Sequence, residues 1–270
     1  MTRALLAFGI WIYASLAMTL QSEAAAVPLP ASLTRGETAT VVEVVDADTV
    51  RLDDGDGKPG RQVRLVGTQG PKLPLGRPNY PTWPLAPEAR AHLVGLVQGK
   101  RVTLHYGGAR EDRYGRILAH LTTEDGTWIQ GAMLADGFTR VYTFADNRSA
   151  IPEMLALEAQ ARAAKRGIWA NAYYRIRKPD DLKGAADSFQ IVEGRVLQAT
   201  ATRDRAYLNF GADYKTDFTV SIAKRDFKAF GRAFDPKRFA NHVVRVRGWI
   251  ESINGPAIDA THPEQIEVLE

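Results

Sequence analysis

A chain of 270 residues can form one large or two modest domains, each able to bury its own core. Hydrophobic residues at 45% and charged residues at 24% are ordinary for a globular protein, and a net charge of +4 is compatible with an anionic partner such as nucleic acid. The chain has no cysteine, which excludes disulfides and thiolate chemistry.

The N-terminal segment, residues 1–26, has the pattern of a secretory signal. Arg3 supplies a positive start, an apolar run covers residues 4–20, and the alanines at 24–26 are small residues suited to cleavage. An uncleaved membrane anchor is the alternative, because the run is almost long enough to span a bilayer. The small residues at the end of the apolar run favour cleavage, so we expect an exported protein, periplasmic or secreted. Residues 27–37 are then a short tether.

The first predicted strand pair contains an aspartate and an arginine that can meet. β-Branched residues over 38–45 predict a buried strand, Asp46-Ala47-Asp48-Thr49 turns the chain, and residues 61–66 predict the return strand. Arg64, near the end of that strand, is expected to face Asp48 across the hairpin. Such a pair is typical of sites that hold a phosphate or a metal-bound phosphate.

Three helices and one further pair of strands are predicted after this hairpin. The patterns predict helices over 87–97, 129–135 and 151–166, and paired strands over 101–106 and 115–122. A loop rich in proline and glycine, residues 67–86, precedes the first helix, and its Tyr80 and Trp83 are expected to pack the loop onto the domain. The alternative is that these aromatic side chains stack on a base near the site.

Five short motifs in this stretch are similar to the signature segments of the staphylococcal nuclease (thermonuclease) family. They are Asp46-Ala47-Asp48-Thr49, Arg64-Leu65-Val66-Gly67 with Pro71 following, Arg113-Tyr114-Gly115-Arg116, Pro87-Glu88-Ala89 at a helix start, and Lys165-Arg166-Gly167-Ile168-Trp169 at a helix end. They occur in the family's order from about residue 38 to residue 169. The resemblance implies a mainly β fold with helices (α+β), namely a staphylococcal-nuclease-like OB barrel with three helices over residues 38–170.

The resemblance also implies site roles. Members of the family hydrolyse nucleic acid with the help of calcium, so Asp48 would be a metal ligand, and Arg64 and Arg116 would be catalytic and phosphate-binding residues. Tyr114, in the same motif as Arg116, would contact the substrate.

Two positions depart from the family pattern. The family has an aspartate that helps bind calcium where this chain has Gln69, and a glutamate that helps activate water where this chain has Lys72. The first change adds one positive charge and the second adds two, so the site is three units more positive. Calcium requires oxygen ligands and compensating negative charge, and only Asp48 clearly remains, so we expect Ca²⁺ binding to be weak.

The loss of the glutamate also predicts weak or absent cleavage, because a positioned general base contributes about 10²–10⁴ in rate. Repulsion from the two arginines offers one alternative, in which Lys72 loses its proton and acts as the base. An exposed lysine usually stays charged, so Lys72 is not expected to be a working base.

The pattern changes beyond the nuclease-like stretch. Residues 171–187 predict a linker, and residues 188–270 predict five short strands with one helix, which suggests a second small OB-like β-barrel. This part is also similar to a module that follows thermonuclease-like domains in exported bacterial proteins. Tyr207, Phe210 and Trp249 are candidates for a platform on which bases stack, with core packing as the alternative.

These observations lead to three hypotheses for the function. The first is an exported thermonuclease-like protein with a degenerate site, which binds nucleic acid or another phosphodiester with weak or no calcium-dependent cleavage. The second is an active phosphodiesterase that hydrolyses DNA or RNA, and the third is a non-enzymatic exported protein that binds a partner. No later segment is apolar enough to cross a membrane, and no histidine pair has the spacing of a zinc site.

Overall fold

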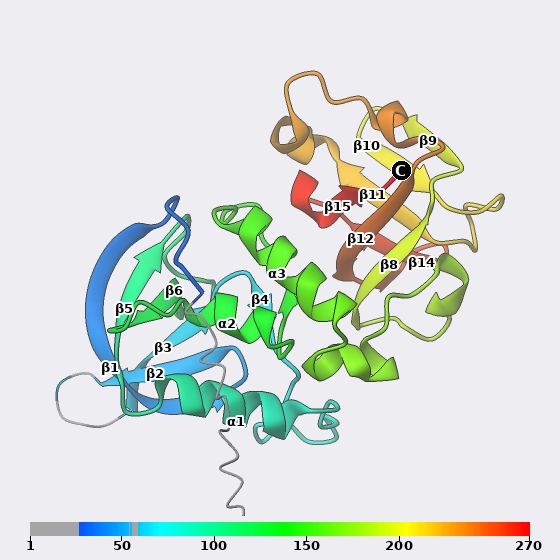
Figure 1. Cartoon of the computed structure of the whole chain (residues 1–270). Helices are drawn as coiled ribbons and strands as arrows, with labels where there is room; N and C mark the ends of the chain where they lie inside the picture. Colours follow the sequence, from blue (N-terminus) through cyan, green and yellow to red (C-terminus); the bar gives the residue numbers. More distant parts are fainter. Residues whose placement is uncertain (1–26, 54, 56–58) are drawn as a thin grey trace, which may run out of the picture.

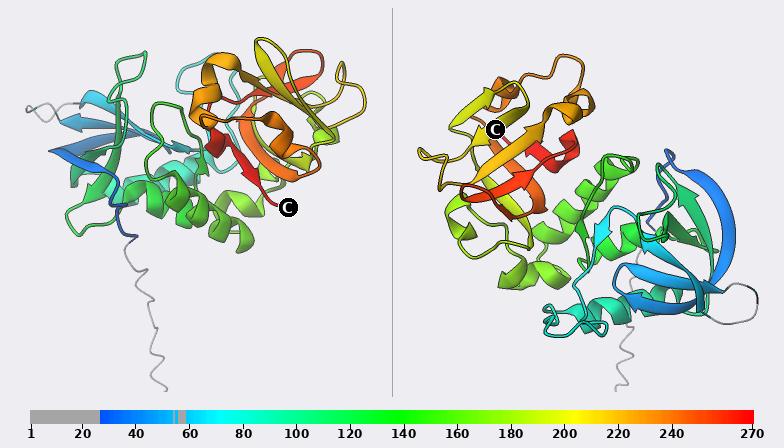
Figure 2. Two further views of the ribbon diagram at one scale, coloured as in Figure 1. Left: turned by 90° about the horizontal axis from the view of Figure 1, so that it is seen from above. Right: turned by 180° about the vertical axis from the view of Figure 1, so that it is seen from behind.

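The computed structural model describes residues 27–53, 55 and 59–270, and the predicted signal at residues 1–26 lies outside this part of the chain. The described chain forms a barrel with three α-helices and then a C-terminal β region, residues 188–270 (Figure 1). Figure 2 shows the same two parts from two further sides, with helix α3 (Ile151–Ala163) between them. The predicted α+β class is confirmed. None of the described helices has the length and apolar character that a membrane crossing needs.

The barrel closes through five strands in the order β1-β2-β3-β6-β5. Their bounds are Thr34–Asp46 for β1, Thr49–Asp53 for β2, Pro59–Leu65 for β3, Arg101–Tyr106 for β5 and Ile117–Thr123 for β6. Neighbouring strands are antiparallel except β3 and β6, which run parallel. Val44, Val50 and Leu104 are fully buried inside the barrel, because a strand places every second side chain on one face.

Helices cover the barrel and complete its core. Helix α1 (Ala86–Val97) has a proline in its first turn and buries Leu93 against the barrel, and α2 (Ile129–Ala135) buries Met133 in the same core. The predicted strands and helices of this part are confirmed with shifts of a few residues at their ends. Helix α3 ends at Ala163, earlier than the predicted residue 166.

Short elements connect the barrel to the C-terminal β region. Strands β4 (Thr68–Gln69) and β7 (Arg140–Val141) pair with each other outside the barrel. The segment predicted as a linker forms the 3₁₀ turns η2 (Ala172–Tyr174) and η3 (Pro179–Leu182), and the turn η1 (Gly167–Ala170) comes just before it. Tyr174 packs beside Trp83, and Leu182 joins the core of the C-terminal β region, so this segment is packed along its length.

The C-terminal β region has two sheets around one apolar core. The larger sheet has the order β13-β14-β11-β10-β9 and the smaller has the order β15-β12-β8. The bounds are Phe189–Arg195 for β8, Gln198–Ala201 for β9, Arg205–Asn209 for β10, Thr219–Ala223 for β11, Val243–Trp249 for β12, Glu251–Ser252 for β13, Pro256–Asp259 for β14 and Ile266–Val268 for β15, with 3₁₀ turns η4 at Lys224–Phe230, η5 at Pro236–Phe239 and η6 at Pro263–Gln265.

Two sequence predictions for this region are wrong. The described region has eight strands, β8 to β15, where five were expected, and β9, β13 and β14 escaped prediction because they are two to four residues long and show no clear alternation. The one helix expected here is the 3₁₀ turn η4. Of the three candidates for a stacking platform, Phe210 packs in the core, which was the alternative, and Tyr207 and Trp249 belong to different sheets.

A buried ion pair joins α3 to the C-terminal β region. Glu158 of α3 and Arg247 of β12 are both almost fully buried, with Arg247 Nη2 3.0 Å from Glu158 Oε2. Glu158 also accepts the backbone N–H of Val141 at 2.8 Å, and Arg247 pairs with Glu267 at 2.6 Å. Charged groups are tolerated in such a position only when they are paired, so this contact fixes how the two parts of the chain meet.

The substitution Glu158→Ala should lower the free energy of unfolding by about 3–5 kcal/mol, because it removes one partner of a buried charge. Urea unfolding followed by circular dichroism measures this loss. Glu153→Ala on the exposed side of the same helix is the control and should change stability by at most about 0.5 kcal/mol. Equal losses in the two variants would contradict the role assigned to Glu158.

Candidate nucleic-acid site

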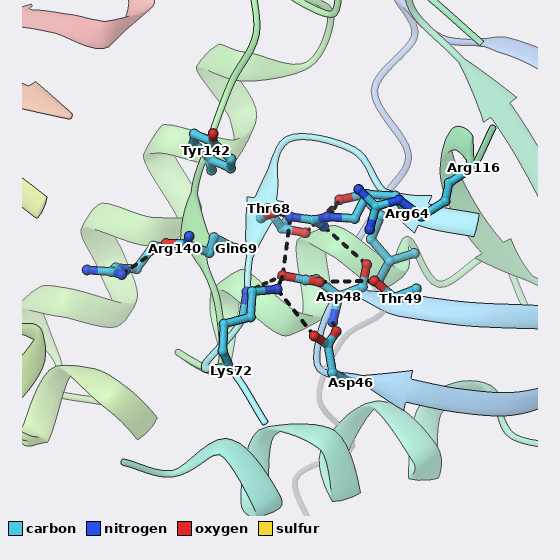
Figure 3. Close-up of polar contacts among 12 residues, drawn as sticks. Asp46, Asp48, Thr49, Arg64, Thr68, Gln69, Lys72, Arg116, Arg140 and Tyr142 are labelled. Carbon is cyan, nitrogen blue, oxygen red and sulfur yellow. Dashed lines mark hydrogen bonds and ion pairs between the residues drawn. The ribbon is translucent and has the colours of Figure 1, made fainter. Parts of the chain in front are cut away.

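The candidate site is built around Asp48, which is fully buried in the turn between β1 and β2. Three groups meet at its Oδ2 atom: Lys72 Nζ at 2.6 Å, the backbone N–H of Gly70 at 2.7 Å and Arg64 Nη2 at 3.2 Å (Figure 3). Thr49 Oγ1 donates to the other carboxylate oxygen at 3.2 Å. One carboxylate therefore connects the β1–β2 turn, the end of β3 and the loop after β4.

This arrangement depends on a glycine at position 70. A Cβ atom there would collide with the side chain and the backbone of Ala47. The loop after β4 therefore approaches the β1–β2 turn closely enough to donate to Asp48 because Gly70 has no side chain.

Lys72 lies between two carboxylates. Its Nζ is 2.6 Å from Asp48 Oδ2 and 3.3 Å from Asp46 Oδ2, and its side chain is 19% exposed. The ion-pair partners of Lys72 are thus carboxylates. The hypothesis that repulsion by two arginines turns Lys72 into a base gains no support from this geometry.

Most N–H groups of the Arg64 guanidinium donate hydrogen bonds to backbone carbonyl oxygens of this chain. Its Nη1 donates to the carbonyl oxygens of Asp48 and Leu65 at 3.1 and 2.8 Å, and its Nη2 donates to the carbonyl oxygen of Thr68. Asp48 Oδ2 is a further partner of Nη2. Within the described chain, the Nε–H group of Arg64 remains without a partner, so Arg64 can offer a phosphate little more than this one donor.

The clustered charges move the pKa values of the two carboxyl groups in opposite directions. Burial opposes ionisation of Asp48, but the charges of Arg64 and Lys72 outweigh burial and hold the pKa of Asp48 well below its usual range. Burial, followed by repulsion from Asp48, raises the pKa of Asp46 to about 6, and the charge of Lys72 acts against this rise. Asp48 is therefore ionised at neutral pH, whereas Asp46 changes its charge near pH 6.

Gln69 does not contribute to the Asp48 cluster. Its Oε1 accepts a hydrogen bond from Arg140 Nη2 at 3.0 Å, and both side chains are buried (Figure 3). The guanidinium of Arg140 also lies 4.8 Å from the centre of the Phe189 ring and 5.3 Å from that of Tyr174. Position 69 therefore supports the contact between β4 and β7 and supplies no oxygen beside Asp48.

A cleft of about 550 Å³ opens beside this cluster and includes Arg64 in its wall. Arg116 and Tyr114, both predicted to meet the substrate, line the same cleft. Arg116 Nη2 is paired with Asp112 at 2.6 Å, and Tyr114 is 68% exposed. The charged lining consists of three arginines and three carboxylates, so its formal charge is zero: Arg64, Arg113, Arg116, Glu111, Asp112 and Asp146.

The calcium ion implied by the resemblance does not fit these donors. Ca²⁺ takes about six to eight oxygen ligands at about 2.3–2.6 Å. Asp48 is already saturated by cationic and N–H donors, Gln69 Oε1 is bound to Arg140, and the ammonium of Lys72 fills the space between the two carboxylates. Among residues 27–53, 55 and 59–270, no group of three His, Asp or Glu side chains has an arrangement that could hold a metal ion.

Sequence reasoning missed four residues of this site, namely Asp46, Gly70, Arg140 and Tyr142. Asp46 partners Lys72, Gly70 donates to Asp48, Arg140 holds Gln69, and Tyr142 lines the cleft. A lysine that replaces an acidic family residue is a signal that a nearby carboxylate must balance it, and Asp46 lies in the same motif as Asp48. An arginine within the otherwise uncharged stretch 137–145 is a similar signal for Arg140.

The substitution Asp46→Asn should flatten the dependence of stability on pH. The pKa of Asp46 is about 6 in the folded protein and about 3.9 in an unfolded chain, so between these values the unfolded chain has already lost a proton that the folded protein keeps. The free energy of unfolding therefore falls by up to about 1.4 kcal/mol per pH unit as pH rises through this window because of Asp46. Above pH 6 Asp46 is ionised in both states, and its contribution no longer changes. Urea unfolding between pH 4 and pH 7 should show this difference from wild type, whereas Asp180→Asn at an exposed site should keep the wild-type slope. A wild-type slope in Asp46→Asn would contradict the assignment.

Comparisons with known proteins identify the family of this chain. A family model described as staphylococcal nuclease homologue matches residues 62–171. A protein of Escherichia coli named "Uncharacterized endonuclease" is 32% identical over 132 residues, which are 49% of this chain and 76% of that protein. The thermonuclease of Staphylococcus intermedius is 31% identical over 137 residues, which are 50% of this chain and 77% of that protein. An uncharacterized protein of Bacillus anthracis is 34% identical over 131 residues, which are 48% of this chain and 59% of that protein. Together with the closed barrel and its helices, these matches place the chain in the staphylococcal nuclease family.

Proposed function

We propose that this chain is an exported thermonuclease-like protein that binds the phosphodiester backbone of nucleic acid and cleaves it weakly or not at all with calcium. One observation carries the proposal. The ammonium of Lys72 lies 2.6 Å from the Asp48 carboxylate, which is the group on which a metal site would depend. Lys72 thus acts as a tethered cation that neutralises Asp48 in place of a metal ion.

A tethered ammonium cannot replace the chemistry of a divalent ion. A metal ion polarises a phosphoryl oxygen and lowers the pKa of bound water, which supplies the nucleophile. Lys72 is already engaged with Asp46 and Asp48, and no glutamate stands at position 72 to take a proton from water. The cluster therefore retains a stable fold around Asp48 but lacks the groups that activate the attacking water.

Binding to nucleic acid is supported by membership of the family and by the cleft with Arg64, Arg116 and Tyr114. The affinity should be modest, because carboxylates balance the arginines of the lining and most N–H groups of Arg64 hold the chain. Export is supported by the signal pattern of residues 1–26.

An active nuclease is the second candidate, because several relatives carry the names endonuclease or thermonuclease. An activity gel that contains DNA or RNA distinguishes the binding protein from the active nuclease when one copy is developed with calcium and another with a chelator. A clear zone that needs calcium and disappears in Arg64→Ala would favour the active enzyme over the binding protein.

The substitution Lys72→Glu should create calcium binding, because it removes the cation and leaves three carboxylates near one another. We expect at least about a tenfold gain in calcium affinity by calorimetry, which corresponds to about 1.4 kcal/mol. Gln69→Asp alone should add little, since its carboxylate would pair with Arg140. Lys100→Glu is the matched control, with the same charge change at an exposed site, and should leave affinity unchanged. Calcium binding by the wild type as tight as by Lys72→Glu would refute the tethered-cation proposal.

Wild-type protein should bind a single-stranded oligonucleotide with a salt dependence that reflects few phosphate contacts. Two or three contacts predict a slope of about −1.4 to −2.1 in a plot of log K against log salt concentration. Arg116→Ala should weaken binding and reduce the magnitude of the slope by about 0.7, because it removes one contact. Arg203→Ala, at an exposed position of the C-terminal β region, is the control and should do neither. Fluorescence anisotropy measures both quantities, and binding that is insensitive to salt would favour a non-enzymatic protein partner instead.

A further inference from the structure

One wall of the cleft belongs to a segment that the C-terminal β region holds in several places. Tyr142, Phe144 and Asp146 of this segment line the cleft together with Arg64. The segment is contacted from β12 and from the turn η6 with its N-terminal flank. The pairs are Val141 O with Arg247 Nη1 at 3.1 Å, Tyr142 Oη with Trp249 Nε1 at 2.9 Å, Thr143 Oγ1 with His262 Nε2 at 2.6 Å, and Arg148 Nη2 with Glu264 Oε1 at 2.6 Å. The family model ends at residue 171, so these partners all lie beyond the part of the chain that it matches.

Of these four polar contacts between described residues, the one between Trp249 and Tyr142 reaches a side chain that lines the cleft. The indole N–H of Trp249 donates to the hydroxyl oxygen of Tyr142. The Tyr142 ring packs edge-on against Phe144 and Phe189, with centroid distances of 4.7 and 5.0 Å. Packing limits where the ring can lie, and the hydrogen bond fixes where its hydroxyl oxygen lies.

This hydrogen bond leaves the hydroxyl proton of Tyr142 available. The oxygen accepts from Trp249, and no acceptor for its proton exists in the part of the chain that the structure describes. Burial raises the pKa of Tyr142, so the hydroxyl remains a neutral donor at neutral pH. A neutral donor is useful in this cleft, because Arg64 has most of its N–H groups bound to backbone carbonyls.

Trp249 is only partly covered by the core of the C-terminal β region. It ends β12 with 39% of its surface exposed, whereas Phe189, its neighbour on the adjacent strand, is buried. Its indole N–H group is directed to Tyr142 of the cleft wall.

We propose that Trp249 is a positioning residue of the cleft, which holds the hydroxyl of Tyr142 in place for a phosphodiester ligand. The C-terminal β region is then part of the nucleic-acid site. This proposal rests on the proposed binding of nucleic acid, and its test therefore includes a measurement that needs no ligand.

A double-mutant cycle tests the proposal with Trp249→Phe, Tyr142→Phe and the combined variant. Affinity for a fluorescently labelled single-stranded oligonucleotide should fall about three- to tenfold in each single variant, the effect of losing one hydrogen bond. The combined variant should bind no more weakly than Tyr142→Phe, because Trp249 acts through the Tyr142 hydroxyl. Trp169→Phe is the matched control, since the indole nitrogen of Trp169 has no hydrogen-bond partner among the residues that the structure describes and lies outside the cleft lining. This variant should bind within about twofold of wild type.

A role limited to structure would give a different cycle. Trp249→Phe would then weaken binding by the same factor whether or not Tyr142 keeps its hydroxyl, and this result overturns the proposal. Wild-type affinity in Trp249→Phe overturns it as well.

The second measurement is the indole N–H resonance of Trp249 in nitrogen-15 spectra of the protein without ligand. Tyr142→Phe should shift this resonance and leave that of Trp169 in place. If the wild type binds no oligonucleotide, the proposed function fails, and this spectrum alone decides whether Trp249 holds Tyr142. An unshifted Trp249 resonance overturns the proposal.

Discussion

The buried carboxylate of Asp48 is the constraint on which the site depends. A fully buried anion is stable only when its charge and its hydrogen-bonding capacity are met, and Asp48 meets them with Arg64, Lys72 and the backbone of Gly70. These partners come from two segments, the end of β3 and the loop after β4, and Asp48 itself lies in a third, the β1–β2 turn. The same interactions that make the anion tolerable therefore also bring the turn, the end of β3 and the loop after β4 together.

The replacement of a family glutamate by Lys72 changes what this carboxylate can do. An internal ammonium has a fixed position and one charge, so it balances Asp48 permanently and leaves no vacant place for an ion between Asp46 and Asp48. The raised pKa of Asp46 is part of the same balance, since two close buried carboxylates repel each other and only one of them has several cationic partners. The pairing of Lys72 and the raised pKa of Asp46 thus both follow from the burial of two carboxylates side by side.

The C-terminal β region is connected to the site through the cleft wall. Buried Glu158 and Arg247 fix α3 against β12, and the backbone of Val141 shares their hydrogen bonds. Because Gln69 and Arg140 pair on the neighbouring strands β4 and β7, the loop that carries Lys72 and the wall that carries Tyr142 are parts of one packed unit. The cleft wall therefore has contacts with both parts of the chain.

The sequence by itself determined the strands and helices of the first part and the meeting of Arg64 with Asp48, because alternation, helix periodicity and turn residues are local signals. The closed barrel was implied by the resemblance of five short motifs to the nuclease family. It could not determine the partner of Lys72, the capture of Gln69 by Arg140 or the contact of Trp249 with Tyr142, which join residues that are 26, 71 and 107 positions apart. The same limit applies to β9, β13 and β14 and to the 3₁₀ turn after β11, because these short elements show no clear periodicity of hydrophobic residues. The physical reason is that charge pairing and side-chain packing are decided by distance in space, and only the folded chain sets those distances.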